Sequence, residues 1–273
     1  MFLQDAMFKS SSILLLLTIF GTHGSYAKGI KWELGAGLAG FDIPLYIGSA
    51  QNKQYLVPVP YIKLKSKYLE IGEGVKGFLF TSPTMRLDLS ADAGVPVRSN
   101  DSIVRQGMPN LNTVLQFGPS LEITMSGSRT GLEELRLEFP VRLALATDIK
   151  HTENIGWIFE PRFTYESRRE HKQGIAYSAT FGLRYATRDY HAYYYDVDPA
   201  YATPQRPVFA SDKGYSGLIT NLVASWRDEN MIYWATLRYR NLNNAAYENS
   251  SLVEVKDYYL FGAGVTWVFA SSL

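Results

Sequence analysis

The chain reads Leu135-Arg136-Leu137-Glu138-Phe139-Pro140-Val141-Arg142-Leu143-Ala144-Leu145 near its middle. Every odd position of this stretch is apolar, whereas charged residues stand only at even positions. Successive side chains of a β-strand point to opposite faces, so the pattern predicts a strand with one apolar and one charged face. The same period of two recurs at residues 84–94, 114–125, 155–166, 177–185, 216–227 and 231–240. Helical spacing fits none of these stretches, and we predict an all-β chain.

Two kinds of β-protein carry such a pattern: a membrane barrel, and a soluble periplasmic β-sandwich or lipocalin-like barrel. The alternating stretches exceed the roughly five or six residues of an average soluble strand, and their apolar faces carry aromatic residues near the strand ends, where barrels place interfacial girdles. The last stretch contains Gly264-x-x-Trp267-x-Phe269, which is similar to the C-terminal assembly signal of outer-membrane proteins, although four residues follow it. These features favour an antiparallel transmembrane β-barrel.

The number of strands depends on the segment between Tyr55 and Phe80. Outer-membrane barrels usually have long external loops and short periplasmic turns, which places residues 95–112, 147–154, 188–214 and 241–256 outside. This assignment requires an odd number of strands between Tyr55 and Phe80. One strand there gives a barrel of about ten strands, and three give about twelve. We expect ten, because Pro58 and Pro60 interrupt hydrogen-bond ladders.

The composition excludes several classes of protein. The 273 residues contain no cysteine, which rules out disulfides, thiolate metal sites, cysteine nucleophiles and an acylated N-terminal cysteine. The 27 Lys and Arg residues nearly balance the 26 Asp and Glu residues, which argues against nucleic acid as a partner. Aromatic residues make up 14% of the chain and there are 22 glycines, a combination that suggests β-structure at a lipid interface.

The start of the chain has the organisation of an export signal. Lys9 precedes a short apolar run at residues 13–20, which is far shorter than the roughly 20 residues of a transmembrane helix. Small residues at the two positions that a signal peptidase reads place the mature start at Lys28. We expect a cleaved signal peptide at residues 1–27 and one barrel domain at residues 28–273, located in the outer membrane and in contact with its lipid.

Three groups of residues carry a resemblance to a known family. They are Gly35-x-Gly37 with Pro44-x-Tyr46-x-Gly48-Ser49 and Pro58-x-Pro60-Tyr61, then Tyr190-x-x-Tyr193-Tyr194-Tyr195-Asp196-Val197, and finally residues 246–253. Together they span essentially the whole mature chain, which resembles the MipA/OmpV family of outer-membrane barrels, named partly for a scaffolding protein that binds a lytic transglycosylase. The chain departs from the family pattern at Asp196, where many members have Gly, at Ser251, where they usually have Pro, and in its C-terminal extension.

The resemblance implies a non-enzymatic scaffold or assembly factor for enzymes that remodel murein, the peptidoglycan of Gram-negative bacteria. The implied partners are a murein lytic transglycosylase and a bifunctional murein synthase, docked on the periplasmic turns. The most charged of these turns spans residues 166–173, and Arg168, Arg169 and Lys172 are the candidate contacts. The alternative function is a small-solute pore or a ligand-gated channel of the outer membrane.

The resemblance also singles out two loops. Pro44, Tyr46 and Gly48 suit a tight external turn that holds a tyrosine over the lumen. Tyr193, Tyr194 and Tyr195 form an aromatic run in the largest loop. These residues serve either to pack the loops or to form a saccharide or partner site.

The polar faces of the predicted strands carry both signs of charge. The inward candidates are Arg86, Asp88, Asp92, Glu122, Glu134, Arg136, Glu138, Arg142, Glu160, Arg162, Glu166, Arg184, Arg238 and Arg240. Seven are acidic and seven are basic, and opposite charges on neighbouring strands can pair across a narrow barrel. The balance favours a plugged lumen over a wet pore lined by the same charges.

We predict no catalytic, cofactor or metal site. The histidines of the mature chain are His151, His171 and His191, and none stands at metal-ligand spacing from another ligand type. Asp148 with His151, or Asp189 with His191, could imitate a hydrolase pair. Two polar residues close together in a polar loop are expected by chance, however, and they do not define an enzyme.

Overall fold

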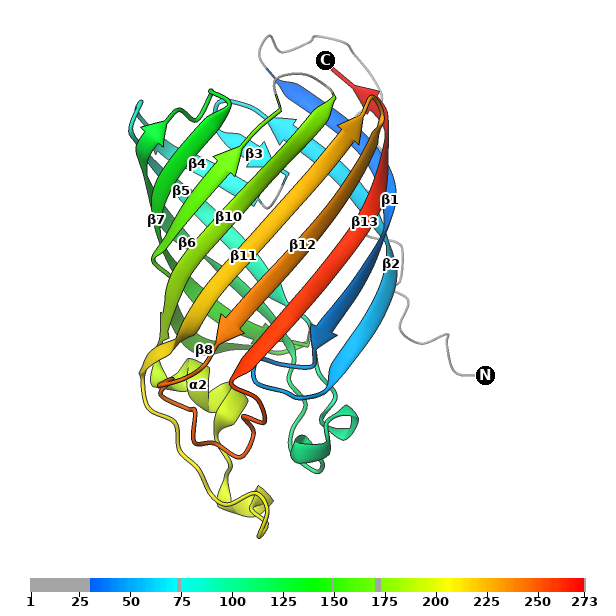
Figure 1. The fold of residues 1–273 in the computed structure, drawn as a ribbon. Coiled ribbons are helices and arrows are strands. Elements are labelled where there is room, and N and C mark those ends of the chain that lie inside the picture. The colour runs from blue at the N-terminus through cyan, green and yellow to red at the C-terminus, as the bar shows by residue number, and fades with distance from the viewer. Residues whose placement is uncertain (1–29, 73–74, 149, 170–172, 273) are drawn as a thin grey trace.

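The computed structural model describes residues 30–72, 75–148, 150–169 and 173–272, which form a closed antiparallel β-barrel (Figure 1). The predicted signal peptide lies outside the described residues. The barrel closes because β13 (Asp257–Ser271) pairs with β1 (Lys31–Pro44). The predicted all-β fold is confirmed.

The wall has twelve strand positions within the described residues. The remaining strands are β2 (Asn52–Lys65), β3 (Leu69–Ile71), β4 (Val75–Thr81), β5 (Met85–Gly94), β6 (Thr113–Gly127), β7 (Glu133–Thr147), β8 (Thr152–Phe159), β9 (Arg162–Ser167), β10 (Gly174–Ala186), β11 (Gly214–Asp228) and β12 (Met231–Asn241). β8 and β9 share one position, because both pair with β7 and with β10 and only Glu160 and Pro161 separate them. The 13 strands therefore make a twelve-position barrel. The expected count of ten is wrong, and the alternative of twelve is confirmed.

The segment between Tyr55 and Phe80 accounts for this difference, because it contains three strands. β3 has only three residues; it pairs with β2 at Leu64 and Lys65 and with β4 over its whole length. An alternation of period two becomes readable only over about four residues or more. The sequence pattern therefore merges this short strand with its neighbours.

Most of β2 has a strand partner on one side only. It pairs with β1 over all 14 residues, but within the described ranges its other edge is covered only at Leu64 and Lys65. Pro58 and Pro60 stand at alternate positions of the uninterrupted ladder with β1, so their ring nitrogens, which carry no hydrogen, face the free edge. The two prolines protect an exposed edge against pairing with another chain, and they do not break the strand.

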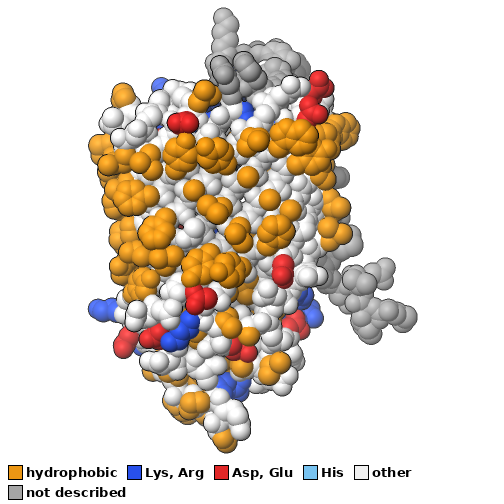
Figure 2. Space-filling view, viewed as in Figure 1, with side chains coloured by type: hydrophobic (Ala, Val, Ile, Leu, Met, Phe, Trp, Pro, Cys, Tyr) orange, Lys and Arg blue, Asp and Glu red, His pale blue; other side chains and the backbone are white. Residues whose placement is uncertain are grey.

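The outer wall carries an apolar band between two aromatic girdles (Figure 2). Near one end, Trp226 stacks on Tyr233 with ring centroids 5.3 Å apart. Near the other end, the ring of Tyr239 lies 5.1 Å from that of Tyr259. The exposed apolar side chains between the girdles include Leu38, Phe163, Phe181, Leu222 and Leu237. A contiguous surface of this kind fits the hydrocarbon core of a bilayer, which confirms the predicted lipid-facing side.

The two ends of the barrel differ in their connections. At the upper end of Figure 1 the strands are joined by short turns, such as residues 128–132 and 229–230. At the lower end lie the long segments, residues 95–112, 187–213 and 242–256. By the usual asymmetry of outer-membrane barrels, we assign the long-loop end to the cell exterior and the short-turn end to the periplasm.

The long segments hold the few helical turns of the described residues. These are η1 (Ser99–Asp101), η2 (Ile103–Arg105), α2 (Arg188–Tyr195) and η3 (Pro199–Tyr201). The expected external loop at residues 147–154 is only a short turn, because β7 continues to Thr147 and β8 begins at Thr152. Among the described residues, no helix has the length and apolar character needed to cross a bilayer.

Candidate functional site

Ion pairs line the lumen wall, and Glu138 lies at the centre of one group of them. Its side chain is 1% exposed and accepts hydrogen bonds from Arg136 Nε at 2.8 Å and from Arg162 Nη2 at 2.6 Å. Arg136 and Glu138 share the inward face of β7 because they are two residues apart, and the register of β9 places Arg162 directly opposite Glu138. A buried carboxylate is thus held between two guanidinium groups.

The same network continues toward the periplasmic end. Arg136 Nη1 lies 2.5 Å from the carboxylate of Glu166, and Arg168 lies 2.8 Å from both Glu166 and Glu134. Glu134 is 1% exposed, so it too depends on its positive partners. These contacts join β7 to the turn that follows β9.

A second group of ion pairs surrounds Glu122 on β6. Its carboxylate lies 2.6 Å from Lys76 Nζ and 2.5 Å from Arg86 Nη2. Arg86 also lies 3.7 Å from the fully buried Asp88. Lys76 reaches Glu122 past the intervening strand β5. Sequence reasoning missed it because β4 was merged with its neighbours, and a register shift between Phe78 and Phe80 interrupts its alternation.

A third group lies in the lumen near the periplasmic end. Glu33 on β1 accepts from Arg227 Nη1 on β11 at 2.8 Å and from the Tyr61 hydroxyl at 3.0 Å. Two strands, β12 and β13, lie between β1 and β11 in the wall, so this pair reaches past both of them on the lumen side. Sequence reasoning missed both charged residues, although the parity of Glu33 with the inward-facing Gly35 was readable.

Among the predicted lumen residues nearer the exterior, some arginines have no carboxylate partner. Arg184 lies 2.5 Å from the Glu160 carboxylate, and Arg162 lies 3.3 Å from the same group. Arg142 and Arg238 have no carboxylate within ion-pair distance among the described residues. The lumen is therefore balanced toward the periplasm and has an excess of positive charge toward the exterior.

The external loops pack together into one structure, which we call the external cap. Its buried residues are Tyr46, Val97, Leu111, Tyr195, Val197, Leu242, Ala245, Tyr247, Leu252 and Tyr258. The rings of Tyr195 and Tyr247 stack 3.7 Å apart with an angle of 4° between their planes. Aromatic side chains from loops far apart in the sequence thus form a hydrophobic core outside the strands.

The tyrosines of the predicted family loops tie the cap together. The Tyr46 hydroxyl donates to the Leu252 carbonyl at 2.7 Å, and the Tyr195 hydroxyl donates to the Ile47 carbonyl at 2.9 Å. The Tyr193 hydroxyl accepts from the Asn112 amide at 2.6 Å. These bonds join different loops through backbone groups, which supports the loop-packing role for these tyrosines.

The remaining predicted loop residues shape the same cap. Pro44 is the last residue of β1, and the ring of Tyr194 lies 5.2 Å from that of Tyr190 on α2. Gly48 has a φ of +91°, a conformation that residues with a side chain rarely adopt. Glycine at this position therefore allows the chain to turn beneath Leu242.

His191 is completely buried inside the external cap. Its Nδ1 lies 2.6 Å from the Asp212 carbonyl oxygen and its Nε2 lies 2.6 Å from Ser216 Oγ. Burial is the main cause that lowers the pKa of His191, the hydrogen bond to Asp212 opposes it, and the charge of Arg184 adds to it. The sequence shows only a histidine next to tyrosines, so its burial could not be predicted from it.

We expect the external cap to loosen in mild acid. The unfolded cap would bind a proton on His191 below about pH 6.5, whereas the buried ring resists protonation, so cap stability is fully present above that pH and falls below it. Limited proteolysis of residues 187–213 should therefore be faster at about pH 5 than at about pH 7.5. The H191Q variant should lose most of this pH dependence. Equal dependence in both proteins would contradict the assignment to His191.

The candidate periplasmic contacts are held against neighbouring turns. Arg168, already paired with two carboxylates, also donates to the Ser128 carbonyl at 3.1 Å. Arg169 donates to Ser225 Oγ on β11. Lys172 lies outside the described residues. The two arginines therefore tie the described start of the turn, residues 166–169, to the adjacent hairpins.

The predicted histidines do not come together. His151 is exposed, with its Nδ1 3.9 Å from Asp148 Oδ1, and His191 is enclosed in the external cap. His171 lies outside the described residues. Within the described ranges, no group of three or more His, Asp or Glu side chains is arranged to hold a metal ion.

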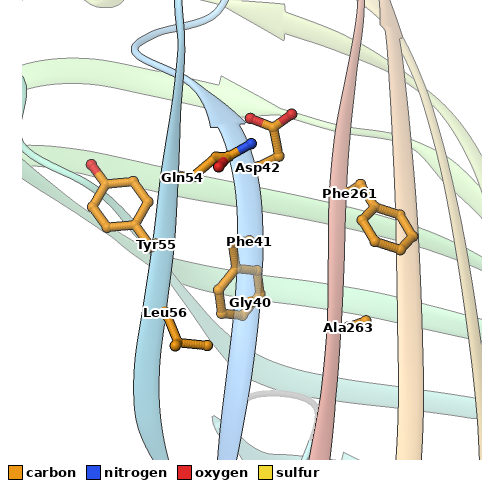
Figure 3. A pocket seen from close by; sticks show the side chains of 8 residues that line it. All are labelled: Gly40, Phe41, Asp42, Gln54, Tyr55, Leu56, Phe261 and Ala263. Atoms are coloured by element: carbon orange, nitrogen blue, oxygen red, sulfur yellow. The ribbon is translucent and has the colours of Figure 1, made fainter.

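A shallow hollow of about 410 Å³ lies where β1 meets β2 and β13 (Figure 3). It is lined by Gly40, Phe41, Asp42, Gln54, Tyr55, Leu56, Phe261 and Ala263. Leu56 is the most exposed of the large apolar residues that are described, and Phe261 is half exposed. Because the hollow is mostly apolar and opens beside these lipid-facing side chains, we place no solute site there.

Comparisons with known proteins match the chain over most of its length. The family described as "MltA-interacting protein MipA" matches residues 36–269. Among solved structures, the translocator domain of the autotransporter NalP from Neisseria meningitidis is similar with 9% sequence identity and a TM-score of 0.42, covering 93% of this chain and 92% of that one. No curated protein matches the chain. The family match extends from β1 to the end of the closing strand.

Proposed function

The chain belongs to the MipA family, and we propose that it is a non-enzymatic outer-membrane scaffold for enzymes that remodel murein. The observation that carries this proposal is the family match, since the family is described by its interaction with MltA, a murein lytic transglycosylase. A lipid-facing barrel is typical of the outer membrane, and we propose that its short turns face the side where murein lies. A bifunctional murein synthase is the second partner that we propose.

The geometry favours the function of a rigid scaffold. It favours neither a catalyst nor an open channel. The external cap packs over the outer end of the barrel, and ion pairs join strands along the lumen wall below it. A barrel held in this way changes shape little, so its turns present a preorganised surface that loses little entropy when a partner binds. We propose that the protein holds its partners in place and carries out no chemistry itself.

We propose that the partner docks on the periplasmic turn at residues 166–173. Arg168 and Arg169 are bonded to neighbouring hairpins, which fixes the start of the turn. Arg168 keeps part of its side chain exposed while it binds Glu134 and Glu166. Arg169 and Lys172 add positive charge to the turn, which suits a partner with an acidic surface, because complementary charges raise the rate of association.

Affinity capture tests this proposal. The mature barrel, immobilised in detergent, should enrich a murein lytic transglycosylase and a murein synthase from envelope extracts, compared with an unrelated barrel. Reversing two charges of the turn with R169E and K172E should reduce this enrichment severalfold. The matched control is R98E with K213E, which makes the same charge change in exposed loops at the opposite end.

Two results would reject the proposal at different levels. If no murein enzyme is enriched over the unrelated barrel, the scaffold function is wrong. If the enzymes are enriched but the turn variant captures as much as the matched control, the scaffold function stands and the docking site lies elsewhere.

A small-solute pore or ligand-gated channel is the second candidate function. The observation that favours it is the strand count, because a twelve-position barrel encloses a wider lumen than the ten strands expected from the sequence. The ion pairs that line this lumen oppose it. The two functions differ in conductance, because a pore carries a steady current and a plugged scaffold does not.

A further inference from the structure

Four arginines face the half of the lumen that lies beneath the external cap. Arg142 is on β7, Arg184 on β10, and Arg238 and Arg240 are two residues apart on β12. Arg142 is 5% exposed, Arg184 is 4% exposed and Arg240 is 7% exposed. Buried arginines are rare unless paired, so the partners of these four decide what the cluster does.

Only one of the four has a carboxylate partner. Arg184 Nη2 lies 2.5 Å from Glu160. Arg142 donates from Nε to the Ser90 hydroxyl at 3.1 Å, which leaves its two terminal nitrogens without a hydrogen bond among the described residues. Within the same ranges, Arg238 and Arg240 form neither a hydrogen bond nor an ion pair.

The four charges lie close enough to repel one another. Arg238 experiences the charges of Arg240 and Arg184, and Arg142 experiences that of Arg184. The four arginines lie in one region of the lumen, because the charges of Arg142, Arg184 and Arg240 all act on the carboxylate of Glu160. The acidic groups that face this region are Glu160 and Asp92, and Glu160 is also shared with Arg162. With Arg162 included, five positive charges therefore face two negative ones.

The surroundings supply a further hydrogen-bond donor. Tyr258, at the start of β13, is 7% exposed and experiences the charges of Arg240, Arg184 and Arg238. Its hydroxyl has no hydrogen-bond partner among the described residues. Planar guanidinium groups bind carboxylate and phosphate oxygens in a bidentate manner, and a phenol hydroxyl adds a neutral donor to such a site.

We propose that Arg142, Arg184, Arg238, Arg240 and Tyr258 form a lumen site for a small oxyanion, the phosphate or carboxylate group of a solute. A bound oxyanion offsets the excess charge and supplies acceptors for donors that the protein leaves unpaired. The site is independent of the scaffold function, because it lies at the opposite end of the barrel from the periplasmic turns.

Thermal unfolding of the purified barrel in detergent, followed by circular dichroism, tests the site. At constant ionic strength, sodium phosphate in roughly tenfold excess over its Kd should raise the unfolding midpoint of the wild type by about 3 to 6 °C relative to sodium chloride. Sodium acetate is the second probe. A response to phosphate alone identifies a phosphate site, and a response to acetate as well identifies a general carboxylate and phosphate site.

The variant R238Q/R240Q should lose the response to both anions. In chloride its midpoint should be at least as high as that of the wild type, because the substitutions remove repulsion. The matched control R98Q, at an exposed loop arginine, should respond like the wild type. If the double variant does not fold, R142Q provides the same comparison. The proposal is overturned if neither anion stabilises the wild type, or if R238Q/R240Q responds as strongly as R98Q.

Discussion

Replacing Glu138 with alanine is expected to lower the free energy of unfolding by about 3 to 5 kcal/mol. The reason is the pair of guanidinium groups that this buried carboxylate binds, from Arg136 at 2.8 Å and from Arg162 at 2.6 Å. Without Glu138, two adjacent positive charges remain in the lumen with fewer acceptors. The cost arises mainly from these uncompensated charges and less from the loss of attraction itself.

Denaturant unfolding of the barrel in phospholipid vesicles measures this effect. The matched control is E153A, which removes a carboxylate that is exposed at the start of β8, and it should change the free energy of unfolding by less than about 0.5 kcal/mol. A loss below about 1 kcal/mol for E138A would mean that water fills the lumen and screens its charges, contrary to a plugged interior.

Replacing Phe181 with arginine is expected to destabilise the barrel by about 2 to 4 kcal/mol in a bilayer. Phe181 is 51% exposed on the lipid-facing side near the middle of β10, so its replacement puts a guanidinium into the hydrocarbon core. The control is I175R, on the same face of the same strand but next to its periplasmic end, where Ile175 is 66% exposed. This substitution should cost about 0 to 1 kcal/mol, because the side chain reaches the interface.

The same vesicle unfolding assay compares the two arginine variants. The informative quantity is the difference between the free energies of unfolding of F181R and I175R. This difference depends on the depth of each position in the membrane, and the general effects of an added charge cancel in it. Similar costs at both positions would show that the apolar band is not centred on a bilayer.

The long strands could be predicted from the sequence because each has a side facing lipid and a side facing the lumen. Over β7, the alternation from Leu135 to Leu145 places Arg136 and Glu138 on one face, and the structure pairs them there. Length makes this possible, since many residues repeat the same signal. The family resemblance added the expected barrel type and is confirmed by the match over residues 36–269.

Short strands and distant partners could not be predicted in this way. β3 is too short to show a period, so ten strands were expected where the wall has twelve positions. Pro58 and Pro60 were interpreted as breaks because sequence does not show which edge of a strand is free. The pairing of Glu33 with Arg227 joins residues 194 positions apart, and only the closure of the barrel brings them together.

The external cap shows the same limit for a candidate site. The run of tyrosines at residues 193–195 indicates an aromatic loop, but the ring that stacks on Tyr195 belongs to Tyr247, in another loop. No spacing in the sequence connects these two residues. Their contact depends on how four loops meet above the same lumen, and the burial of His191 depends on it as well.

Conductance across a planar bilayer tests most directly the central claim that this barrel is a closed support. We predict that the wild-type protein shows no steady conductance, because the external cap covers the outer end of the barrel and the ion pairs around Glu138 narrow its lumen. Removing two of the lumen charges with R136A and R162A should open a measurable current through the same barrel. Steady conductance of the wild-type protein would contradict the account and would make the small-solute pore its function.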